Sequence, residues 1–201
     1  MTRPDDARED VNRDQIAVWA ASVPPRPADL VNPRSGEEIW FDGDEMETRM
    51  VGRIPAHSPG PPLHIHRAVE DNATVISGRL RFTIDGRVHD LWPGDSVRVP
   101  PGTRHRWENP YEEAACMVGR VRPGIVHEIE LRLLYGALAR PRPNPLELAV
   151  AFHDGDSYPG DMPLPIARAI FGLLYTISSV VGVAARFRVA NLPRALVRNP
   201  H

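Results

Sequence analysis

Three histidines and two acidic residues occur in two segments of the chain and could together form one site. His64 and His66 form a His-x-His pair, Glu70 and Asp71 follow shortly after, and His105 comes later. The segments that carry them read as neighbouring short β-strands, and residues two apart in a strand point to the same face. Imidazole nitrogens suit iron, nickel, copper or zinc, and a carboxylate extends the range to manganese. These residues therefore predict a divalent transition-metal site inside a small β-barrel.

The residues around His105 also follow a recognisable spacing. Residues 94–109 contain, in order, Gly94, Pro100, Gly102, His105 and Asn109. This resembles the second signature motif of the cupin superfamily, which runs Gly, five residues, Pro-x-Gly, two residues, His, three residues, Asn. The resemblance implies a cupin barrel in which this histidine binds a metal.

The first cupin motif, His-x-His, four residues, Glu, six residues, Gly, is matched with one departure. His64, His66 and Gly78 fit, but Asp71 stands at the glutamate position and Glu70 precedes it by one place. The resemblance implies that the two histidines are metal ligands and that an acid completes the set.

Two acids compete for that ligand position. Alternation puts Asp71 on the same face as Ala73 and Val75 and leaves Glu70 pointing away, so Asp71 is favoured. A shift of one residue in the preceding turn would bring Glu70 inward, and Glu70 stays the alternative acid ligand. A third reading treats both acids as solvated, with a three-histidine site or no metal.

Large apolar side chains are candidates for the wall of a substrate pocket. Trp107 lies two residues after His105 in the expected strand, so their side chains share a face. Phe82, Met117 and Trp40 are further candidates. An apolar and aromatic pocket over a metal predicts a small, largely apolar organic ligand. The remaining histidines are interpreted as packed or surface residues: His57, His89, His127, His153 and His201.

The chain divides into three parts. Residues 1–36 predict an arm with a short helix in Ile16–Val23, followed by prolines. Residues 37–122 predict closely spaced strands, with a hairpin turn at Asp85-Gly86. The expected strands include Glu37–Phe41, Glu47–Ile54, Arg79–Ile84, Arg87–Leu91, Ser96–Val99 and Ala114–Val121. The fold class is therefore mainly β, a single jelly-roll barrel of the cupin kind with an N-terminal arm and C-terminal α-helices.

Residues 123–201 change to a helical period. Helices are predicted at Val126–Ala139, Pro145–Phe152 and Pro165 to about Ala185. Such a helical tail resembles that of some bacterial single-domain cupins. The last predicted helix contains Ala169–Ala185, 17 residues without a charge, which is short for a membrane span. Packing against the barrel or a partner, as in a homodimer, is favoured over membrane association.

Composition excludes some functions. The net charge of −2 gives no electrostatic case for nucleic-acid binding. All 24 basic residues are arginine, which we attribute to genome composition. The single cysteine, Cys116, and the charged N-terminus without a signal-peptide core favour the cytoplasm.

Two classes of function follow. The resemblance implies a metal-dependent enzyme acting on a small organic metabolite, by oxygenase or by isomerase, cyclase or decarboxylase chemistry. The alternative is a sensor or carrier that binds a metabolite without turnover, possessing a degraded metal site. The three histidines favour the enzyme, and the departure at the acid position favours the binding module.

Overall fold

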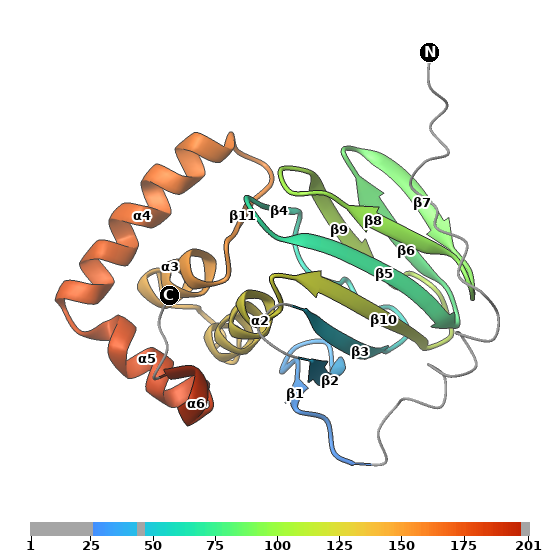
Figure 1. Ribbon diagram of the computed structural model, residues 1–201, viewed down its shortest axis with the longest axis horizontal. Helices are drawn as coiled ribbons and strands as arrows, with labels where there is room; N and C mark the ends of the chain where they lie inside the picture. The colour runs from blue at the N-terminus through green and yellow to red at the C-terminus, as the bar shows by residue number, and fades with distance from the viewer. Residues whose placement is uncertain (1–25, 44–46, 198–201) are drawn as a thin grey trace.

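The computed structural model describes residues 26–43 and 47–197, which form two antiparallel sheets followed by helices (Figure 1). The predicted helix at Ile16–Val23 lies outside the described residues. The larger sheet has the strand order β1 (Leu30–Val31), β2 (Glu38–Gly43), β3 (Thr48–Ile54), β10 (Ala115–Arg122), β5 (Glu70–Ser77), β8 (Ser96–Val99). The smaller sheet has the order β11 (Ser157–Pro159), β4 (His64–His66), β9 (Arg104–Glu108), β6 (Leu80–Ile84), β7 (Arg87–Leu91).

Alternating apolar residues from both sheets meet in one core. Leu80 and Phe82 of β6 pack with Val75 of β5 and Met117 of β10, and all four are buried. This is the inward face that alternation predicts for half-buried strands. The mainly β jelly-roll architecture is confirmed, although the strands described form two separate sheets and not one closed barrel.

The hairpin between β6 and β7 turns at the predicted residues. Asp85 and Gly86 both adopt positive φ, 46° and 78°. A two-residue hairpin turn of this kind requires a left-handed backbone at both positions, which glycine adopts freely and aspartate tolerates. The turn fixes the pairing of Phe82 with His89, and on the other edge of β6 Phe82 lies opposite Trp107 of β9.

Helices follow the sheets at one side (Figure 1). They are α2 (Gly124–Leu138), α3 (Pro145–Asp154), α4 (Leu164–Val180), α5 (Val183–Asn191) and α6 (Arg194–Val197). α3 begins where Asn144 accepts a hydrogen bond from the backbone N–H of Leu146 at 2.9 Å, an N-cap that precedes Pro145. Leu133 and Leu134 of α2 pack with Ile39 and Met50 of the larger sheet, so α2 closes this side of the sandwich.

The prediction of one helix over Pro165 to Ala185 is wrong at its C-terminal end. Gly182 has φ of 73°, the chain turns there, and α4 and α5 are bent by 90° relative to each other. Glycine adopts this left-handed conformation at little cost. The conformation does not continue an α-helix, so α4 ends before Gly182. No single helix in the described part is long and apolar enough to cross a membrane; only α4 and α5 together satisfy the criteria of length and composition.

The arm and the tail each add a strand to the sheets. β1 lies before residue 37 and pairs with β2. β11 lies after α3 and pairs with β4, with Ser157 opposite His66 and Pro159 opposite His64. The tail therefore reaches the strand that carries two of the candidate metal ligands, a contact that the helical period did not reveal.

Candidate metal centre

Two neighbouring strands bring the three predicted histidines together. His64 of β4 lies directly opposite His105 of β9, and their ring centroids are 4.2 Å apart. The centroid of the His66 ring lies 5.0 Å from that of His64 and 5.4 Å from that of His105. His66 and His105 are buried, with 2% and 4% of their surface exposed. The pairing of β4 with β9 thus converts two distant sequence motifs into one cluster.

Each of these imidazoles has its Nδ1 next to a backbone carbonyl. The carbonyl partners are those of Pro62 for His64 (2.9 Å), Thr103 for His105 (3.0 Å) and Asp156 for His66 (3.3 Å). A carbonyl only accepts, so Nδ1 is the donor in each ring. This leaves Nε2 of His64 and His66 for a ligand, whereas Nε2 of His105 faces the Asp71 carboxylate. Metal-binding histidines in proteins are commonly oriented by such a bond from the second ring nitrogen.

Asp71 completes the cluster from β5. Its Oδ2 lies 3.1 Å from His105 Nε2 and 3.4 Å from His66 Nε2. One ligand atom from each of the three histidines and Asp71 fall within 4.8 Å of one another. Glu70 points elsewhere and accepts a hydrogen bond from Arg98 Nη2 at 2.7 Å. Of the two acids, Asp71 is therefore the one beside the histidines, as strand alternation predicted.

Two atoms of the cluster show that these residues fit a metal ion. His66 Nε2 and Asp71 Oδ1 are both buried and have no hydrogen-bond partner among the residues that the structure describes. Buried polar atoms are almost always satisfied, because an unpaired one costs the free energy of its desolvation. A divalent cation would bind a lone pair from each of them, and the donor set of three imidazoles and one carboxylate suits a first-row transition metal.

Burial and the neighbouring charges shift the pKa values of the cluster in opposite directions. Burial, helped by His105 and His66, lowers the pKa of His64 to about 3, so this imidazole is neutral at physiological pH. Burial would raise the pKa of Asp71, but the charge of His66 and the hydrogen bond with His105 hold it well below its usual value. Burial would lower the pKa of His105, but the hydrogen bond with Asp71 and its charge raise it.

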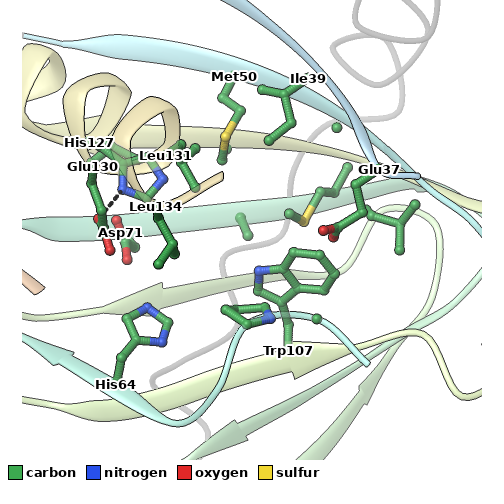
Figure 2. A pocket seen from close by; sticks show the side chains of 18 of the residues that line it. Glu37, Ile39, Met50, His64, Asp71, Trp107, His127, Glu130, Leu131 and Leu134 are labelled. Carbon is green, nitrogen blue, oxygen red and sulfur yellow. Dashed lines mark ion pairs between the residues drawn. The ribbon is translucent and has the colours of Figure 1, made fainter. Parts of the chain in front are cut away.

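Helix α2 adds two groups that sequence reasoning did not place at the site. His127 is buried, and its Nδ1 lies 3.2 Å from Glu130 Oε2 (Figure 2). The same oxygen lies 3.9 Å from His66 Nδ1. His66, His127 and Glu130 form a second group of possible metal ligands. Burial would raise the pKa of Glu130, but His66 and His127 lower it to about 2, so it is a carboxylate.

His127 was interpreted as an ordinary packed or surface histidine, and Glu130 was not singled out. His127 is packed, but it lies beside the candidate ligands. The available signal was spacing: His127, Glu130 and Leu134 share one helical face, so two polar residues interrupt a face that must be buried.

A cavity of about 130 Å³ extends from the histidines between the sheets and α2. Its walls are mostly apolar. They include three of the side chains that were predicted to line a pocket, Phe82, Trp107 and Met117. Figure 2 shows Trp107, Met50 and Leu134 around this space.

The prediction that Trp40 lines the pocket is wrong. Trp40 packs with Val51, Ile76 and Val118 in a separate cluster, and its Nε1 donates to the carbonyl of Arg26 at 3.0 Å. Strand parity is the physical reason, because Ile39, one residue earlier, takes the cavity side and Trp40 must take the other.

Other residues of the two motifs serve structure. Asn109 is fully buried, and its Nδ2 donates to the carbonyls of Pro55 (2.9 Å) and Glu113 (2.8 Å), which ties two loops together. His57 is exposed and pairs with Glu112, and the ring of His153 stacks on Tyr175. His201 lies outside the described residues.

Comparison with known proteins identifies the middle of the chain. Residues 50–119 match the family described as "Cupin domain". Quercetin 2,3-dioxygenase from Bacillus subtilis is 26% identical over 80 residues, which are 40% of this chain and 22% of that protein. "Oxidoreductase iacF" from Pestalotiopsis fici is 29% identical over 159 residues, which are 73% of this chain and 76% of that protein.

Among solved structures, an RmlC-like cupin from Shewanella frigidimarina superposes with a TM-score of 0.44 at 19% identity. The superposition covers 48% of this chain and 85% of that one. The segment that matches the family contains His64, His66, Asp71 and His105, together with both signature motifs. The middle of the chain, residues 50–119, therefore matches the cupin domain family, and α-helices follow it.

Proposed function

We propose that this protein is a metal-dependent cupin that acts on a small, largely apolar organic molecule. His64, His66, His105 and Asp71 are the proposed ligands of one divalent transition metal. The observation that carries the proposal is the convergence of one ligand atom from each of these residues within 4.8 Å. His66 Nε2 and Asp71 Oδ1 are buried there without a hydrogen-bond partner among the residues described. A metal bound there would supply Lewis acidity or, if it is redox-active, the capacity for oxygen chemistry.

The residues around the ligands are suited to handling a substrate. Phe82, Met117 and Leu134 line the cavity with apolar surface, which would exclude water from the reacting end of the substrate. Burial would lower the pKa of His127, but Glu130 raises it, so the imidazole can hold a proton at Nδ1 beside the cavity. His127 and Glu130 are therefore the proposed proton-handling pair.

The names of two relatives support oxygenase chemistry over isomerase or cyclase chemistry. One is called a dioxygenase and the other an oxidoreductase. The first match covers only 22% of the relative, so its substrate is not transferred to this chain. A carrier or sensor that holds the same molecule without converting it is the second candidate, and the mostly apolar cavity supports it.

The metal is tested by elemental analysis of protein expressed with iron, manganese, nickel, copper or zinc supplied. We expect about one transition-metal ion per chain, and His105→Ala should lose most of it. His57→Ala is the matched control, because His57 is exposed and lies outside the cluster. Full metal occupancy in His105→Ala would show that the proposed site is wrong.

Catalysis is separated from binding by incubating the metal-loaded protein with small aromatic and aliphatic hydroxy compounds under air and under argon. Mass spectrometry of the products then gives the answer. An oxygenated product that forms only under air supports the oxygenase, and an isomeric product under both gases supports the isomerase. Saturable binding without any product would leave the carrier or sensor as the function.

A further inference from the structure

A buried acid lies at the end of the cavity away from the histidines. Glu37 immediately precedes β2 and is only 3% exposed. It shares the cavity side of the chain with Ile39, two residues later, and both line the cavity. Figure 2 shows Glu37 on the far side of this space from His64 and Asp71. Its position makes it a candidate for contact with the distal end of a bound molecule.

One oxygen of this carboxyl group is held by the protein. Oε2 accepts hydrogen bonds from Asn32 Nδ2 (2.8 Å), Ser35 Oγ (2.9 Å) and the Tyr135 hydroxyl (3.3 Å). These donors come from the loop before β2 and from α2, so three bonds fix the plane of the group. The fixed orientation is what a binding site for a directed hydrogen bond requires.

The other oxygen is not used by the protein. Oε1 is buried and has no hydrogen-bond partner within the described ranges 26–43 and 47–197. Nor do these ranges contain an ion pair to Glu37, and burial raises its pKa despite the three bonds to Oε2. An isolated buried acid costs stability, and an apolar side chain of similar size would avoid that cost. The unpaired oxygen is accounted for if it binds a group of the ligand.

We propose that Glu37 selects substrates that carry a hydroxyl group, alcohol or phenol, at the end opposite the metal. This rests on the proposed function, which places the reacting end of the substrate at the histidines. A hydroxyl both donates and accepts, so it pairs with Oε1 whether the carboxyl is protonated or ionised. An apolar end would leave Oε1 unpaired, and an anionic end would be repelled by the ionised form.

The test compares two probes that differ only in this hydroxyl. Binding of 3-(4-hydroxyphenyl)propanoate and 3-phenylpropanoate to the metal-loaded full chain is measured by titration calorimetry. The hydroxylated probe should bind about tenfold more tightly to the wild type, the effect of satisfying one buried polar atom. Glu37→Leu should remove the preference. Equal binding of the two probes to the wild type, or an unchanged preference in Glu37→Leu, would overturn the proposal.

A second variant keeps the test decisive if Glu37→Leu does not fold. In Glu37→Gln the three donors hold the amide oxygen, so the NH₂ group faces the cavity and can only donate. The affinity for 3-(4-methoxyphenyl)propanoate relative to the hydroxyl probe should then rise above the wild-type ratio. An unchanged ratio would overturn the proposal. Glu128→Gln is the matched control, because Glu128 pairs with Arg132 and does not line the cavity.

The metal proposal can fail separately. The metal content of Glu37→Leu and Glu37→Gln should equal that of the wild type, because Glu37 is outside the metal cluster. His105→Ala should keep the hydroxyl preference while losing the metal. A wild type that binds no metal but prefers the hydroxyl probe would reject the metal and support the assignment of Glu37.

Discussion

Glu70 and Asp71 are adjacent acids with opposite surroundings. Asp71 lies among the histidines, and Glu70 is bound by Arg98. Asp71→Ala should therefore weaken metal binding by more than about tenfold, since even changes in outer-sphere partners commonly cost 10–100-fold. Glu70→Ala should leave metal affinity nearly unchanged. Competition with a chelator measures both affinities.

The reverse order of effects would mean that Glu70 is the ligand and that β5 is shifted by one residue. Small and equal effects would support a site of three histidines. The matched pair is informative because both changes remove a carboxylate from the same strand.

At the level of residues, local pattern was enough to predict the histidines and the acid. His64 and His66 share a face because they are two apart, and the same alternation separates Asp71 from Glu70. Glu37 and Glu130 could not be predicted this way. They reach the cavity from the loop before β2 and from α2, and no short-range pattern determines how those segments pack on the sheets.

Helix α2 contributes Glu130, whose Oε2 lies 3.9 Å from His66 Nδ1. Glu130→Gln keeps the shape but removes the charge, so the basicity of His66 as a ligand should fall. We expect the affinity for metal to drop by about 10–100-fold. Glu128→Gln on the same helix is the control, because Glu128 pairs with Arg132. Chelator competition should show no loss in the control, and an equal loss in both would mean that helix stability is responsible.

A bidentate salt bridge joins helix α5 to helix α3. Arg188 donates to both carboxylate oxygens of Asp154, at 2.7 Å and 2.8 Å. Burial would raise the pKa of Asp154, but His153 and Arg188 lower it below its usual value of 3.8. A lowered folded-state pKa means that the pair stabilises the tail above about pH 4 and that this contribution is lost as pH falls further.

Asp154→Asn should lower the free energy of unfolding at pH 7 by about 1–3 kcal/mol, the range for hydrogen bonds to charged groups. The difference from the wild type should shrink as the pH falls below about 4, because the carboxyl of the unfolded chain is then protonated before that of the folded protein. Urea unfolding at pH 7 and pH 3 measures both values. A difference that is independent of pH would contradict the role of the charge.

At the level of elements, periodicity predicted the helices better than their ends and contacts. α3 begins at Pro145 as expected, because its capping residue and proline are adjacent in sequence. The break at Gly182 was missed, since an isolated glycine in an apolar run is compatible with a helix. β11 was also missed, because it is three residues long and exists only through its pairing with β4.

At the level of the whole molecule, the outer face of α4 is an exposed apolar surface. It exposes a row of apolar side chains at helical spacing: Ile166, Ile170, Leu173, Ile177 and Val180. The inner face is covered, because Ala167 is buried against Ile65 and Tyr158. Ending the chain near Pro163 would therefore uncover Ile65, which lies between two candidate ligands, so truncation would disturb the metal site as well as assembly.

We propose that this face of α4 binds a second copy of the chain, since contiguous apolar patches of this kind are rarely left exposed on monomers.

A point substitution tests the proposed dimer without uncovering β4. Val180→Glu should convert a dimer into a monomer in sedimentation without detergent, because Val180 is 82% exposed and a buried unpaired charge opposes association. Val88→Glu, on β7 and 60% exposed, is the matched control and should remain a dimer. Metal content should be unchanged in both variants, because neither residue belongs to the cluster. A wild-type monomer would reject the dimer, and a wild type recovered only with membranes would instead assign the apolar face to lipid.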